Sequence, residues 1–205
     1  MATSLIHTTA AKVLASVVLV GGAASVAGLG TFGSFTSSTS ASESVTSGTV
    51  QLGLAQGAVA TTVAATQVLP GDTIQRAVTL TRSAGTETFG SVKLSTSAGT
   101  VNLLSTDTTN GLQLTVDSCS VAWTQGAANS VTCGGTTTSV LTSRPVIGSL
   151  VDLAASATQL NAAGATSYLR LSMVLPTGAD NTFQGLTSAI TFTFDATQKA
   201  TTTFR

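Results

Sequence analysis

The chain has 205 residues, of which only 8% are charged, and eight basic side chains balance eight acidic ones. A chain without net positive charge lacks the electrostatic attraction that binding to nucleic acids and anionic membrane surfaces requires, so both are excluded as partners. The length suits a single domain with a sizeable core after removal of a short N-terminal segment.

The first predicted element is an N-terminal signal helix within residues 1–33. A run of apolar and small residues from Val13 to Leu29 follows a lysine and leads into a zone of small residues, as in a secretory signal peptide. The run is shorter than the roughly 20 apolar residues of a membrane span. Thr31 and Gly33 occupy the positions where small residues precede the cut, so cleavage is predicted between Gly33 and Ser34. The chain is therefore expected to contact the membrane only before this processing.

A type IV pilin is the alternative interpretation of this segment. A pilin is cut before the apolar run and keeps that run as an assembly helix, whereas a signal peptide is removed whole. The early glutamate of such pilins is absent after Lys12, which favours the signal peptide.

Residues 34–48 are predicted to form a flexible N-terminal arm before one domain of residues 49–205. The arm is dominated by Ser and Thr, so it cannot form a core of its own. From residue 49 onward, apolar and polar side chains alternate with period two in short runs bounded by Gly, Asn, Asp or Ser. This pattern predicts an all-β domain of about eight or nine strands, arranged as a jelly-roll-type sandwich of two sheets.

The clearest alternation occurs late in the chain, where two runs are predicted core strands. Their inward-facing residues are Leu169, Leu171, Met173 and Leu175 in the first run and Ile190, Phe192 and Phe194 in the second. One short helix is predicted from Leu150 to Ala163, because Leu and Ala recur there at helical spacing. Gly164 is expected to end this helix.

Cys119 and Cys133 are predicted to form a disulfide. They are the only cysteines, they flank Trp123 in two short strand-like runs, and export would place them in an oxidising compartment. The alternative, a reactive or metal-binding pair, needs more ligands than two cysteines. The single histidine, His7, lies in the predicted signal peptide and cannot supply one.

Several motifs together carry a family resemblance. In chain order they are Gly30 to Phe35 (GTFGSF), Ser44 to Leu52 (SVTSGTVQL), Leu69 to Asp72 (LPGD), Asn181 to Gly185 (NTFQG) and Phe192 to Gln198 (FTFDATQ). In this order and spacing, the chain resembles the TasA/camelysin family of secreted bacterial matrix-fibre proteins. The segment between Val101 and Leu150 departs from the family pattern, and the resemblance does not explain the cysteine pair.

The resemblance implies a secreted subunit that polymerises into fibres of the biofilm matrix or cell surface. Its main partner would be further copies of itself, with signal peptidase acting first and an accessory anchor or assembly protein as an additional candidate. The freed arm would add as a strand to an open sheet edge of the next copy. The arm is therefore the predicted donor strand, and Phe35 and Val45 are its only large apolar side chains.

An enzyme is the alternative that the same family suggests, because some camelysin-like members are described as metalloproteases. Catalytic zinc needs about three protein ligands, typically including histidine, and the processed chain has no histidine and only singly spread carboxylates. The sequence therefore predicts no catalytic residue, no metal, no cofactor and no enzyme. Asp72 and Asp180 are expected to accept backbone N–H bonds in turns. A carbohydrate-binding jelly roll is a further alternative, which would need exposed aromatic side chains.

Overall fold

The computed structural model describes residues 39–40, 50–54, 57–126 and 130–199. All of these residues belong to one compact unit, Thr36–Arg205. The predicted signal peptide, its cleavage residues Gly33 and Ser34, and the arm residues Phe35 and Val45 lie outside the described residues. None of the helices within the described ranges is both long and apolar enough to cross a membrane.

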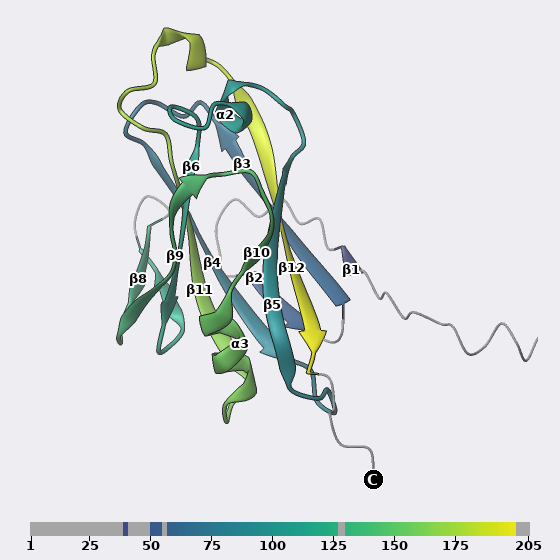
Figure 1. Cartoon of the computed structure of the whole chain (residues 1–205). Coiled ribbons are helices and arrows are strands. Elements are labelled where there is room, and N and C mark those ends of the chain that lie inside the picture. Colours follow the sequence, from purple (N-terminus) through teal and green to yellow (C-terminus); the bar gives the residue numbers. More distant parts are fainter. Residues whose placement is uncertain (1–38, 41–49, 55–56, 127–129, 200–205) are drawn as a thin grey trace, which may run out of the picture. The chain divides into compact units, whose positions relative to one another are not determined.

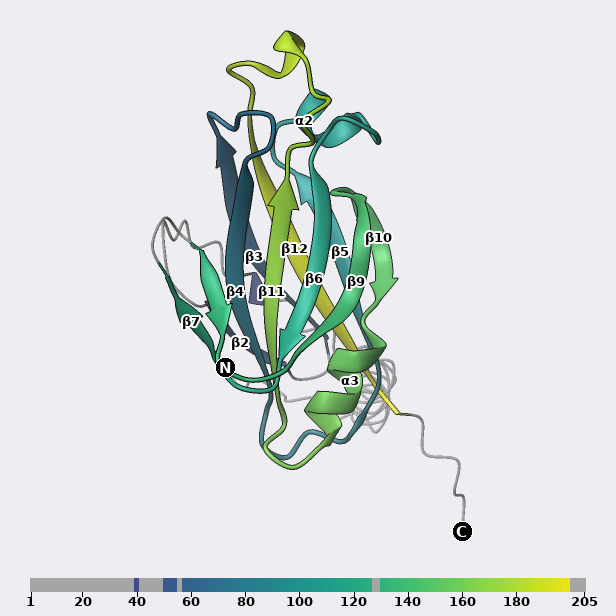
Figure 2. The ribbon, with the colours of Figure 1, turned by 90° about the vertical axis from the view of Figure 1, so that its left-hand side faces the viewer.

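Two five-stranded sheets pack against each other (Figures 1 and 2). Sheet A has the strand order β1-β3-β12-β5-β10, with β1 (Thr39–Ser40), β3 (Gly57–Thr66), β12 (Thr187–Gln198), β5 (Phe89–Ala98) and β10 (Gly148–Asp152). Sheet B has the order β2-β4-β11-β6-β9, with β2 (Val50–Leu54), β4 (Thr73–Arg82), β11 (Thr166–Val174), β6 (Gln113–Cys119) and β9 (Thr137–Pro145). A separate hairpin pairs β7 (Trp123–Gln125) with β8 (Val131–Cys133). The predicted two-sheet, mostly β fold is confirmed.

The core lies between the two sheets, because each strand directs alternate side chains inward. The predicted inward-facing residues of the two late runs are all buried: Leu169, Leu171, Met173, Leu175, Ile190, Phe192 and Phe194. Their strands, β11 and β12, are each the central strand of a sheet. Burial of a single large apolar side chain of this kind contributes about 1.5–3 kcal/mol, so these two strands hold the sandwich together.

Short helices lie between some of the strands. The helix α3 (Ala154–Asn161) packs Ala157 and Leu160 against the core. It begins later than the sequence pattern predicts, because Leu150 belongs to β10 and has a φ of 50°, which is not helical. The sequence pattern missed α2 (Leu103–Thr106), which a capping box between Asn102 and Ser105 stabilises. A 3-10 turn, η2 (Asn181–Phe183), precedes β12.

Candidate functional site

Strand β3 supplies an edge that could accept a further strand. It pairs with β12 along its whole length on one side. On the other side, Val59 and Ala60 pair in parallel with Thr39 and Ser40 of β1. The stretch Thr61 to Thr66 therefore has no strand beside it on that side within the described part of the chain.

Strand β4 of the facing sheet has a similar half-open edge. The parallel strand β2 pairs with residues 78–82 of β4, and residues 73–77 have no ladder partner on that side within the described ranges. The β7–β8 hairpin lies beside this stretch, where Val131 donates its N–H to the side chain of Gln75 (Figure 2). The open stretches of β3 and β4 lie at the same end of the domain, because a single turn joins Thr66 to Thr73. The carboxylate of Asp72 fixes this turn by accepting the N–H of Leu69 at 2.8 Å, which confirms the predicted role of Asp72.

Arg76 lies within the open stretch of β4. It is on the same face of the strand as Val78 and Leu80, which belong to the core between the sheets. The side chain is half-buried, and this burial lowers the pKa of its guanidinium. The described residues offer it no hydrogen-bond or ion-pair partner. Arg76 is therefore a half-buried positive charge near this edge with no partner among the described residues.

The opposite edge of the sandwich, formed by β9 and β10, is irregular. The pairing of β10 with β5 shifts in register between Gly148 and Val151, and the pairing of β9 with β6 shifts twice. Leu150, within the β10 shift, has a φ of 50° and an exposed fraction of 56%. Such bulges interrupt the regular row of backbone groups that an incoming strand would need.

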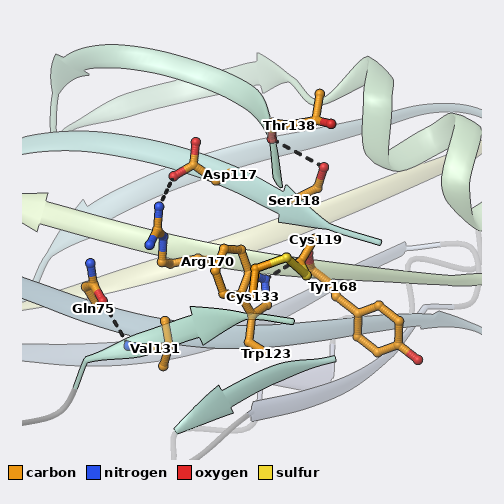
Figure 3. Close-up of polar contacts among 10 residues, drawn as sticks. All are labelled: Gln75, Asp117, Ser118, Cys119, Trp123, Val131, Cys133, Thr138, Tyr168 and Arg170. Atoms are coloured by element: carbon orange, nitrogen blue, oxygen red, sulfur yellow. Dashed lines mark hydrogen bonds and ion pairs between the residues drawn. A yellow bond between two sulfur atoms is a disulfide. The ribbon is translucent and has the colours of Figure 1, made fainter. Parts of the chain in front are cut away.

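The β7–β8 hairpin covers the outer face of sheet B, where the predicted disulfide is confirmed (Figure 3). Cys119 of β6 is bonded to Cys133 of β8, and Trp123 donates its indole N–H to the backbone carbonyl of Tyr168 at 3.1 Å. Arg170 stacks 4.7 Å from the centre of the Trp123 ring and binds the carboxylate of Asp117 at 2.7 Å. Because Trp123 is only 6% exposed, it cannot stack on a sugar, which removes the main aromatic candidate for carbohydrate binding.

Two further carboxylates among the described residues, those of Asp107 and Asp180, stabilise turns. Asp107 accepts the N–H groups of Asn110 and Thr109, each at 2.8 Å, and these bonds lower the pKa of its carboxyl. Asp180 accepts both the hydroxyl and the N–H of Thr182, which lower its pKa and confirm its predicted turn role.

The possible metal ligands of the described residues do not lie together. Both cysteines are bonded to each other, Asp117 is paired with Arg170, and the described residues contain no group of three or more His, Cys, Asp or Glu side chains able to hold a metal ion. The donors in these ranges therefore do not fit a catalytic metal, which needs about three protein ligands. His7 and Glu43 lie outside the described residues.

The structure leaves some predicted site residues undescribed and shows two features that the sequence patterns did not predict. The predicted donor residues Phe35 and Val45 and the cleavage residues are not described, so their roles stay predictions. The half-open edge and Arg76 were missed. The signal for Arg76 was a basic residue inside the inward-facing alternation that includes Val78 and Leu80.

Comparison with known proteins gave one finding. A family model described as camelysin metallo-endopeptidase matches residues 8–203. No curated protein and no solved structure matches the chain. The family match contradicts the prediction that the chain is not an enzyme, because the family is described as one of metallo-endopeptidases.

Proposed function

The chain belongs to the camelysin metallo-endopeptidase family, and we propose that it is a structural subunit that polymerises outside the cell by donor-strand exchange. The family match supports a TasA/camelysin-type protein that is secreted or held at the cell surface. Polymerisation would follow removal of the signal peptide between Gly33 and Ser34, which frees the arm for contact with a neighbouring copy. The resulting fibre would be part of the extracellular matrix or the cell surface.

The pairing of β1 with β3 is the observation that carries this proposal. Thr39 and Ser40 lie in the predicted arm, and they already form a short parallel pair with an edge strand of the same chain. The remainder of that edge has no strand partner in the described residues, so an arm from another copy could replace β1 and extend along Thr61 to Thr66. This mode of binding is strand addition, in which main-chain hydrogen bonds supply most of the affinity.

The geometry of such a contact favours a filament. The arm and the accepting edge are different surfaces of the chain, so each copy can give one arm and accept another. A head-to-tail contact of this kind continues without closing unless the rotation between copies makes a ring. The β9–β10 edge would stay outside the contact, because its bulges oppose regular pairing.

Deletion of Ser34 to Ser44 tests the proposal directly. The processed chain should form filaments under negative-stain microscopy, and the deleted chain should remain a folded, disulfide-bonded monomer. Thr39→Pro should weaken assembly, because proline removes one N–H and fixes the local backbone. Thr39→Ala is the matched control and should assemble normally. Ordered filaments from the deleted chain would rule out the arm as the donor.

Metal-dependent peptide hydrolysis is a second candidate function, and the family description alone favours it. The described residues do not assemble the ligands for a metal, so any catalytic centre would have to involve other residues of the chain. The test is incubation of the processed chain with an unstructured protein substrate, followed by mass spectrometry. Cleavage that a chelator abolishes, and that added zinc restores, would support the peptidase function.

A further inference from the structure

We propose that Arg76 and the β7–β8 hairpin protect the half-open stretch of β4, residues 73–77, against pairing with a strand of another copy. The inference goes beyond the proposed function, because it concerns a contact that the chain avoids and holds whether or not the arm is a donor strand. A strand edge with unpaired backbone groups can pair with an edge of another molecule, so native proteins protect such edges. A charge directed inward and an element that covers the edge are two common forms of this protection.

The side chain of Arg76 is directed toward the core side of sheet B. Its ladder partner on β11 is Leu171, which is 1% exposed and belongs to the core between the sheets. Residues directly opposite each other in an antiparallel ladder lie on the same face of the sheet. Val78, two residues later on β4, is also a core residue. A charged side chain therefore occupies an inward position in the stretch of β4 that has no ladder partner on one side among the described residues.

Arg76 would oppose a strand that paired with this stretch. The side chain is half-buried, and the described residues supply neither an acceptor nor an opposite charge for it. Although burial lowers the pKa of its guanidinium, this group stays charged in proteins. An added strand would cover the side of β4 opposite to β11 and would remove more solvent from the charge. Because removal of an unpaired charge from water costs free energy, pairing at this edge is disfavoured.

The β7–β8 hairpin adds cover from the outer face of sheet B. Val131 of β8 is 4% exposed, packs with Ala77 of β4 and donates its N–H to the side chain of Gln75 at 3.0 Å. Figure 2 shows the hairpin beside β4, and the disulfide ties β8 to β6. A strand approaching residues 73–77 would therefore meet the hairpin as well as Arg76.

The open stretch of β3 has no such charge. Residues Thr61 to Thr66 include no charged side chain, and the inward positions Thr61, Val63 and Ala65 are all buried. The hairpin packs on sheet B, against β4 and β11, rather than on β3. Protection of β4 would thus direct strand addition to β3, although the two stretches lie at the same end of the domain.

Substitution of Arg76 in the processed full-length chain tests this protection. Arg76→Leu removes the charge and keeps a large side chain at the inward position. It should raise the association constant between copies by about tenfold or more, because pairing no longer buries a charge. Sedimentation velocity over a dilution series, below the concentration at which the wild type forms fibres, measures this change. Hydrogen exchange should show that the amides of residues 73–77 become protected as the concentration of this variant rises.

Two variants are matched controls. Arg76→Lys keeps a charge at the same position, so its association constant should stay within twofold of wild type. Arg144→Leu removes a half-buried arginine from the irregular β9–β10 edge and should also stay within twofold. Urea unfolding confirms that each variant is folded before association is measured.

The contribution of the hairpin is tested in the same chain. Addition of Cys119→Ala and Cys133→Ala to Arg76→Leu should raise the association constant further, because the hairpin is no longer tied to β6. The additional protection from hydrogen exchange should again lie within residues 73–77. Equal association of this chain and Arg76→Leu would show that the hairpin does not protect the edge.

The outcomes are distinct from those that decide the donor-strand proposal. Association of Arg76→Leu at the wild-type level overturns the protective role of Arg76, and so does concentration-dependent protection that lies outside residues 73–77. Protection of residues 73–77 that rises with concentration in the wild type would also overturn it. The donor-strand proposal is decided separately, by fibre formation with and without the arm.

Discussion

The two lateral edges of the sandwich differ in the regularity of their strands, and therefore in how well a further strand could pair with them. At the β9–β10 edge, three register shifts and a residue with positive φ break up the row of backbone groups. At the β3–β4 edge, the strands are regular, and β1 and β2 each cover only part of their neighbour in the described chain. A jelly roll can thus be irregular at one edge and regular at the other, and a regular edge is the kind to which a further strand can add.

The largest effect is expected from a substitution in β12, because this central strand connects the two halves of sheet A that lead to its edges. β12 lies between β3 and β5, and its residue Phe192 is fully buried in the core. Phe192→Ala should lower the free energy of unfolding by about 3–5 kcal/mol, because it leaves a cavity in the core. Urea unfolding measures this change. Thr191→Ala, on the outer face, is the control and should cost about 1 kcal/mol or less, the value of its hydroxyl bond to Thr62.

Removal of the disulfide should act on one side of the sandwich. The variant Cys119→Ala/Cys133→Ala should lose about 3 kcal/mol of unfolding free energy, since the bond closes a loop with a sequence separation of 14. The released hairpin contacts β4, where the side chain of Gln75 accepts the N–H of Val131 at 3.0 Å. Hydrogen exchange should therefore increase in β7, β8 and the adjacent part of β4. Equal acceleration in β10 would show that the two edges are not independent.

Relief of the strained residue at the irregular edge should have a smaller effect. Leu150→Gly should raise the free energy of unfolding by up to about 1 kcal/mol, because glycine adopts a positive φ without steric conflict. Leu150→Ala keeps the strain and should show no such gain. Thermal unfolding of the two variants beside wild type checks this difference. A stabilised Leu150→Gly chain that still assembles through its arm would confirm that the bulge, rather than low stability, distinguishes this edge.

Acid is expected to have the smallest effect on stability, and it should act on the turns that contain Asp107 and Asp180. The pKa values of Asp107 and Asp180 are lowered in the folded chain by the hydrogen bonds that their carboxylates accept. The unfolded chain therefore binds protons first as pH falls, so this contribution is full above about pH 4 and is lost progressively below it. Asp107→Asn should flatten the decline of the unfolding temperature below pH 4. An unchanged decline would show that these bonds do not stabilise the fold.

Much of the fold was predictable because period-two alternation records which side chains enter the core. Phe192 and Phe194 were identified correctly since strong alternation leaves one interpretation of a strand. The start of α3 was wrong because Leu150 fits a helical spacing, whereas the bulge in β10 depends on pairing with β5, which lies about 55 residues earlier in the chain.

The candidate site was less predictable because it depends on which stretches of an edge strand have no neighbouring strand among the described residues. The sequence of β3 does not reveal that only two of its residues have a partner on one side among the described residues. In the sequence Arg76 is an ordinary charge in a strand, because its direction, its burial and the lack of a partner among the described residues all depend on the fold. The disulfide was predictable because two cysteines in a chain with a predicted signal peptide leave few options.

The pairing of distant strands in sheet A determines when in folding the β3 edge is complete. One side of β3 is completed by β12, so Gly57 pairs with Ala196, which lies about 140 residues later in the chain. An accepting edge cannot exist until the C-terminal strand has arrived, and sheets built from such distant pairings fold slowly, over milliseconds to seconds. Under the donor-strand proposal, an incompletely folded chain would therefore carry an arm but no edge to accept one, so growth of a polymer would wait for completed subunits.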